Sequence, residues 1–201
     1  MDNKRREAYI NLIDQLLTSP NGEAEKILQT NQELVDEGLL EIMELRAQQL
    51  AENDGQDAQN AANFLRHLRS RLVELLETSE EYLNFLMEVL LATRQSKGGS
   101  KVVYPLLQQN LDKLDDNFAD ILRNWATNKF SKVEADVAEG IALDIGDLSN
   151  CIQEFPLGSK ANNMEISIAG YEVMLNVFTH KSHRENWATF KIISALPTVT
   201  E

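Results

Sequence analysis

Six aspartates are the residues of this chain whose type and spacing most suggest a catalytic or metal site. They form two clusters, Asp112, Asp115, Asp116 and Asp120 in one segment and Asp144 and Asp147 in another. Carboxylates one turn apart on two helices could bind a hard cation together with a diphosphate group. The pattern therefore predicts one possible function, a small metal-dependent (Mg²⁺ or Mn²⁺) hydrolase or diphosphate-binding enzyme. Its ligands would be Asp112, Asp115, Asp116 and Asp144.

The apolar residues between these acids favour a different interpretation. Leu114, Phe118 and Ile121 recur at the spacing of one helix face, which places the acids on the opposite, solvated face. A diphosphate site would also need basic residues and a larger bundle. On this second interpretation the protein has no bound metal and no cofactor.

Two other residue types could carry chemistry, but neither has the neighbours that it would need. His180 and His183 lie three residues apart and, with Glu185, could bind a metal. A further ligand is not evident, so we expect a solvated helix end. Cys151 is the single cysteine, which excludes an internal disulfide. No histidine lies near it in the sequence to activate the thiol, so we expect a small buried side chain. The sequence predicts no catalytic residue.

The charge and hydropathy of the chain limit its partners. Its 201 residues include 32 acidic and 19 basic side chains, which gives a net charge of −13. Nucleic acids and anionic membranes bind clustered Lys and Arg, so neither is expected as a partner. No apolar run approaches the roughly 20 residues that cross a bilayer. We expect a soluble cytoplasmic protein whose acidic surface favours a protein partner with a basic segment.

Apolar residues repeat every three or four positions along nearly the whole chain, which predicts an all-α fold of about eight or nine helices. Thr78 and Ser131, each followed three residues later by Glu, have the pattern of a capping box at a helix start. The apolar stripe on residues 82–91 is too wide for a helix with one solvated side, so we expect that helix to lie between two layers. Stacked helical repeats, as in an α-α superhelix or solenoid, explain this width, although a compact bundle would bury the same residues.

Two segments of the chain resemble each other. Tyr9 and Tyr82 begin matching segments, and residues 27–31 match residues 106–110 at a shared Leu-Gln-x-Asn. The order of these matches is the same in both segments, which predicts a duplicated multi-helix unit. The predicted domains are a first unit at 1–77, its duplicate at 78–150 and a third helical piece at 151–201.

The third piece resembles part of a known repeat. The second helix of a tetratricopeptide repeat has the spacing found at Ala169, Tyr171, Glu172, Leu175 and Phe178. The chain as a whole resembles the helical N-terminal region of cyanobacterial multidomain proteins, which continue into tetratricopeptide repeats and often end in a caspase-like CHAT peptidase domain. Much of the likeness lies in residues 103–108 and 110–118. The resemblance implies a helical scaffold that ends in one tetratricopeptide-like helical pair, and it implies no catalytic residue.

The resemblance stops where the repeat array would begin. Residues 190–197 lack the Leu-Gly-x-x-Tyr signature of a full repeat, so the chain either ends in a degenerate repeat or is part of a longer relative. We therefore predict a non-catalytic scaffold or adaptor that mediates protein–protein interaction. The predicted partner-binding residues are Asn162, Asn163, Tyr171, Arg184 and Trp187.

Some of these residues allow a second interpretation. Asn side chains bind peptide backbones in groove-forming repeats, but Asn162 followed by Glu165 also has the pattern of a helix N-cap. The apolar residues between Ile168 and Leu196 predict a further possibility, a homo-oligomer formed through the C-terminal helices.

Overall fold

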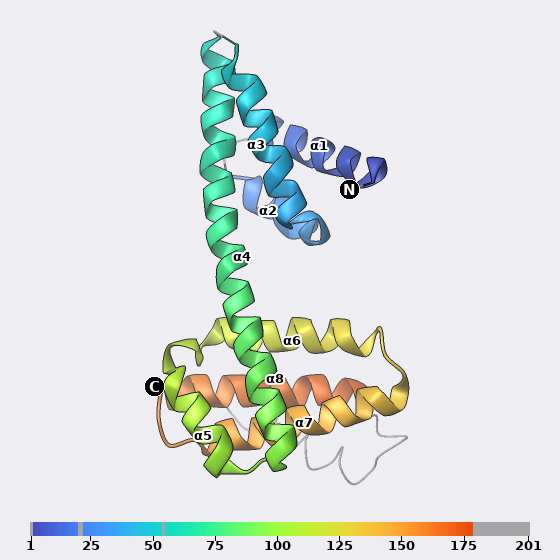
Figure 1. Ribbon diagram of the computed structural model, residues 1–201, viewed down its shortest axis with the longest axis vertical. Helices are drawn as coiled ribbons and strands as arrows, with labels where there is room; N and C mark the ends of the chain where they lie inside the picture. The colour runs from blue at the N-terminus through green and yellow to red at the C-terminus, as the bar shows by residue number, and fades with distance from the viewer. Residues whose placement is uncertain (1, 20–21, 54, 179–201) are drawn as a thin grey trace. The chain divides into compact units, whose positions relative to one another are not determined.

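The computed structural model describes residues 2–19, 22–53 and 55–178, and over these residues it contains eight α-helices, two short 3₁₀ segments and no strand (Figure 1). This confirms the all-α class. The elements are α1 (Asn3–Thr18), α2 (Ala24–Thr30), η1 (Gln32–Leu34), α3 (Glu37–Ala51), α4 (Gln56–Ser96), α5 (Ser100–Gln109), η2 (Leu111–Lys113), α6 (Asp116–Phe130), α7 (Ala135–Glu154) and α8 (Lys160–Val177). None of these helices has the length and hydrophobicity needed to cross a membrane.

The chain divides into two compact units, unit 1 at Met1–Thr78 and unit 2 at Ser79–Glu201. Each unit has its own apolar core. The core of unit 1 combines α1 and α3 with the first half of α4, at Tyr9, Leu12, Ile13, Leu16, Leu39, Ile42, Met43, Ala47, Leu65, Leu68 and Leu72. The second half of α4 belongs to the core of unit 2, where Phe85 packs on Phe118 with ring centroids 5.0 Å apart.

Thr78 does not begin a helix. The 41-residue helix α4 passes through it, and the Thr78 hydroxyl donates to the carbonyl of Glu74. Residues 56–96 contain no Gly or Pro, so the backbone can continue from one apolar stripe to the next. Helix α4 ends only where Lys97 and Gly98 adopt φ values of 53° and 72°.

The second predicted capping box is also wrong. Ser131 lies at the C-terminal cap of α6, and α7 begins four residues later at Ala135. The Ser131 hydroxyl donates to the carbonyl of Asn128 at 2.8 Å, so it satisfies the end of one helix and not the start of the next.

Helix α8 packs against both α6 and α7 in unit 2 (Figure 1). Small residues allow the close approach of α7 and α8. A Cβ atom at Gly170 would overlap with the Ser149 hydroxyl, and a Cβ atom at Gly146 would lie 2.6 Å from the Met174 sulfur. Arg123 of α6 adds ion pairs to α8, at 2.8 Å from Glu165 and 3.2 Å from Glu172.

The same hydrogen bonds occur at matching positions of the two units. In unit 1 the Tyr9 hydroxyl donates to Asp36 at 2.6 Å, and Asp36 caps α3 by accepting from the Leu39 amide. In unit 2 the Tyr82 hydroxyl donates to Asp115 at 2.7 Å, and Asp115 caps α6 by accepting from the Phe118 amide. In both units an Asn at the end of the preceding helix, Asn31 or Asn110, donates to the carbonyl four residues earlier. By these contacts α1 corresponds to the second half of α4, and α3 corresponds to α6. That the two units arose by duplication remains a prediction.

Candidate partner-binding surface

One interpretation of the sequence proposed Asn162 as the N-cap of α8, and the structure shows that this is wrong. The cap is Ser159, whose hydroxyl accepts from the Asn162 backbone amide at 3.3 Å. The Asn162 side chain instead donates to the carbonyl of Leu114 at 3.0 Å. This half-buried contact joins α8 to the segment before α6, and it occupies the amide group that was predicted to bind a partner.

Asn163 and Tyr171 are buried inside unit 2, so the structure corrects their predicted role as partner-binding residues. The Asn163 amide donates to the carbonyls of Phe155 and Leu157. The Tyr171 hydroxyl donates to the Asn150 side chain at 2.6 Å, and burial raises its pKa to about 12. Both side chains hold α8 against neighbouring segments of the same unit.

The two remaining predicted partner-binding residues, Arg184 and Trp187, lie outside the described residues, as do His180, His183 and Glu185. Of the apolar residues predicted to mediate self-association between Ile168 and Leu196, those in α8 are largely buried. Ile168, Ala169, Val173 and Met174 are each at most 7% exposed. This part of α8 is therefore not available to a second copy of the chain.

Other contacts engage three of the aspartates of the proposed metal site. Asp115 caps α6, Asp112 lies 3.5 Å from Lys113, and Asp144 lies 3.6 Å from Arg94. The pKa of Asp144 is raised, mainly by burial. The positive charge of Arg94 opposes this rise, and the negative charge of Asp147 adds to it. Among the described residues, no group of three or more His, Cys, Asp or Glu side chains is arranged to hold a metal ion.

Cys151 is buried, and its thiol donates to the carbonyl of Gly98 at 3.2 Å. Burial raises the pKa of this thiol, and the nearby Asp147 and Glu154 raise it further. The environment therefore favours the neutral thiol, which is the unreactive form.

Unit 1 contains a pocket of about 310 Å³ beside the end of α1 and the start of α4. Its walls are mainly apolar, with Leu16, Leu17 and Phe64 among the lining residues. Among the described residues that line it, Asp57 is the single titratable one, and Asn60 is a neighbouring polar one. These described residues do not form the convergent set of polar groups by which proteins usually orient a small ligand.

The second half of α4 carries a row of exposed apolar side chains, called here the exposed stripe: Leu83, Met87 and Leu91. They are 36%, 37% and 56% exposed. Residues four apart on a helix lie nearly in line, so the stripe extends along two helical turns. The expectation that another layer covers this side of the helix is therefore wrong for these three side chains.

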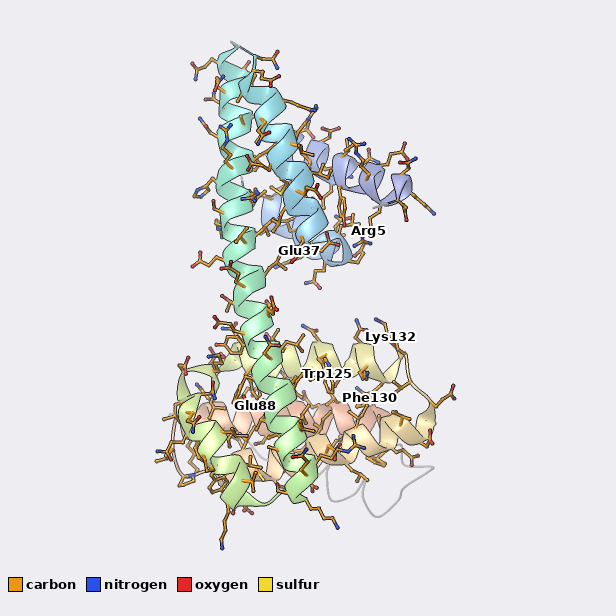
Figure 2. The ribbon with its side chains drawn as sticks, in the orientation of Figure 1. Arg5, Glu37, Glu88, Trp125, Phe130 and Lys132 are labelled. Carbon is orange, nitrogen blue, oxygen red and sulfur yellow. The ribbon has the colours of Figure 1, made fainter. Side chains whose placement is uncertain are left out.

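Rows of different character border the exposed stripe. On the core side, Tyr82, Leu86 and Leu90 are buried in unit 2. On the solvent side, the polar row Glu80, Asn84 and Glu88 repeats at the same spacing of four residues, and all three are exposed. Figure 2 shows Glu88 on α4. The stripe thus lies between a closed apolar core and an acidic edge.

The matching helix of unit 1 shows that the fold does not require this stripe. The hydrogen bonds that pair Tyr9 with Tyr82 place Ile10 at the position of Leu83, Asp14 at that of Met87 and Thr18 at that of Leu91. Asp14 and Thr18 are exposed and polar, and Asp14 lies 3.6 Å from Arg46. A helix in this position therefore tolerates polar residues where unit 2 keeps Met and Leu. This difference between polar and apolar residues is visible when the two segments are aligned in the sequence, so the alignment could have revealed the stripe.

Comparison of the chain with protein-family models, with curated proteins and with solved structures finds no match.

Proposed function

We propose that this protein is a non-catalytic helical adaptor that binds another protein through the exposed stripe. The observation that carries the proposal is the exposure of Leu83, Met87 and Leu91 at positions where unit 1 has two polar residues. Apolar side chains gain free energy when a partner removes them from water, and a few such anchors supply most of the affinity of an interface.

The composition of the chain supports the same proposal. The net charge of −13 disfavours nucleic acid and anionic membranes as partners, which is compatible with a protein partner. The single buried cysteine is compatible with the reducing cytoplasm, where we place the adaptor. The resemblance to the helical region that precedes tetratricopeptide repeats would make the chain a scaffold beside peptide-binding repeats, and this remains part of the proposal.

The test replaces the exposed stripe with the residues of unit 1. The double variant Met87→Asp/Leu91→Thr should fold, because unit 1 carries these residues at matching positions of its own helix. We expect the wild-type chain to capture a partner protein from extracts of the cells that express it, and the double variant to lose that partner. The measurement is affinity capture followed by mass spectrometry, with circular dichroism to verify that the variant is folded.

Leu143→Thr provides the matched control, because Leu143 is 50% exposed on α7 and lies outside the stripe. The control should keep the partner. Equal capture by the wild type and the double variant would show that the stripe is not the binding surface, and it would overturn the proposal.

A further inference from the structure

We infer that the partner segment is an amphipathic helix with Lys or Arg along one edge, which places its apolar face on the exposed stripe and its basic edge beside Glu80 and Glu88. This inference rests on the proposed function and specifies the chemistry of the partner. Three observations support this partner: the length of the stripe, the charge of its border and the size of the apolar surface.

The length of the stripe fits a short helix. Leu83 and Leu91 are eight residues apart, which corresponds to about 12 Å along the helix axis. Helices that dock on another helix use apolar residues at spacings of three, four and seven, and these cover a similar length. The side chains of such a partner could pack between those of Leu83, Met87 and Leu91.

The charge of the border determines the edge of the partner. Glu80 and Glu88 are exposed on the solvent side of the stripe, and the adjacent Asn84 is neutral. Arg94 lies near the end of the stripe, but Asp144 is 3.6 Å from its guanidinium. The α4 row on the solvent side of the stripe is therefore acidic, and a basic edge on the partner would be attracted to it.

The size and charge of the surface disfavour a second copy of this chain as the partner. A stable interface usually buries about 800 Å² on each side, which is far more than three partly exposed side chains provide. A second copy would also carry the same net charge of −13. A short basic helix avoids the charge repulsion, and the small apolar surface suits a weak, reversible complex with it.

The experiment uses the full chain and three synthetic helical peptides as probes. The peptides share one leucine face and differ at one edge, which carries Lys, Gln or Glu. Fluorescence anisotropy of the labelled peptides measures binding at low and at physiological salt. We expect the Lys-edged peptide to bind about tenfold more tightly than the Gln-edged one, with the Glu-edged peptide weakest. This preference should shrink as salt rises, because ions screen exposed charges.

Two variants separate the apolar contribution from the charged one. Met87→Asp/Leu91→Thr should abolish binding of all three peptides. Glu80→Gln/Glu88→Gln should keep binding to the leucine face but remove most of the preference for Lys. Leu143→Thr should bind as the wild type does. Melting temperatures of the variants verify that each remains folded.

The possible failures are distinguishable. Equal, stripe-dependent binding of all three peptides would overturn the inference about charge and leave the proposed function intact. Stripe-dependent capture of a cellular partner without peptide binding would overturn the helical partner alone. A concentration-dependent dimer in sedimentation that Met87→Asp/Leu91→Thr abolishes would identify a second copy as the occupant and overturn the inference. Absence of both peptide binding and stripe-dependent capture would overturn the proposed function as well.

Discussion

Asp36 and Asp115 each use one carboxylate to cap a helix and to bind a buried tyrosine. Asp36 accepts from the Leu39 amide and from the Tyr9 hydroxyl, and Arg5 also donates to it. Burial raises the pKa of Asp36, but the hydrogen bonds from Tyr9, Arg5 and the Leu39 amide together lower it by more. The net shift of this pKa is therefore downward. These carboxylates therefore serve the structure, which explains why an acid-rich segment need not be a metal site.

Tyr171 gives a pH prediction at the scale of one residue. Burial raises its pKa from 10.0 to about 12. Below pH 10 the phenol is protonated in both the folded and unfolded states. Between pH 10 and 12 the unfolded chain loses this proton first, so the stabilising contribution of the neutral phenol is lost as the pH rises. The expected loss at pH 12 is at most about 2 to 3 kcal/mol.

The comparison with Tyr171→Phe isolates this effect, because the other three tyrosines, at positions 9, 82 and 104, are unchanged. Urea unfolding at a series of pH values should show a smaller loss of unfolding free energy for the variant above pH 10. Parallel curves for the two proteins would contradict the assignment of the raised pKa to Tyr171. The variant should also be less stable at neutral pH, since it lacks the hydrogen bond to Asn150.

At the scale of the elements, small residues explain why unit 2 accommodates α8. The apolar positions Ala62, Leu65 and Leu68 of α4 match Ala142, Ile145 and Leu148 of α7, and all six are buried. The same alignment places Arg66 at the position of Gly146 and Arg69 at that of Ser149. Gly146 and Ser149 allow α8 to approach α7 closely, whereas arginines at these positions would prevent it.

Gly170→Ala tests this close packing. The added Cβ would overlap with the Ser149 hydroxyl and lie 3.3 Å from the Ile145 side chain, so α8 or Ser149 would have to move. We expect a loss of about 1 to 3 kcal/mol of unfolding free energy, as is usual for overpacking. Thermal unfolding monitored by circular dichroism measures it. Adding Ser149→Ala should restore part of the loss, because it removes the overlapping hydroxyl.

Gly140→Ala is the matched control for this prediction. Gly140 also lies in a helix, α7, but apart from its own helical turn no atom of the described residues lies within 4 Å of a Cβ added there. Alanine at this position should stabilise the protein by about 0.5 to 1 kcal/mol, because glycine is a poor helix former. Equal effects of the two substitutions would show that α7 and α8 are not in close contact at Gly170.

At the scale of the whole molecule, the two units offer different surfaces from similar helices. Unit 1 presents Ile10, Asp14 and Thr18 along α1, and unit 2 presents Leu83, Met87 and Leu91 along α4. The proposed adaptor would therefore bind its partner through unit 2 alone. A protein that works in this way needs no catalytic group, and its affinity would depend on salt and on the apolar stripe.

If the protein is a non-catalytic adaptor, its melting temperature should show no specific response to divalent metal. Mg²⁺ or Mn²⁺ should change the melting temperature no more than another salt of equal ionic strength does. Asp115 and Asp144 already have partners, and the described residues contain no group of three or more His, Cys, Asp or Glu side chains arranged to hold a metal ion. Differential scanning fluorimetry measures this response. A metal-specific rise in melting temperature that Asp115→Asn or Asp116→Asn reduces would favour the alternative enzyme.

The sequence by itself determined the features that depend on near neighbours along the chain. Its helical periodicity predicted an all-α protein of about eight or nine helices, and the eight α-helices found in the described part of the chain confirm the all-α class. It also aligned Tyr9 with Tyr82 and Asn31 with Asn110. Periodicity and helix-ending residues act over a few positions, so they can be recognised without knowledge of the fold.

Only the tertiary structure decided which apolar faces are covered. Thr78 has the pattern of a helix start but lies within α4, because nothing in residues 56–96 interrupts the helix. Tyr171 was predicted to bind a partner but is buried inside unit 2. Met87 lies on the helix that was predicted to be covered on both sides, but it is exposed. An apolar side chain has the same local pattern in both cases. Its burial depends on residues distant in the sequence, which only the packing of the helices brings beside it.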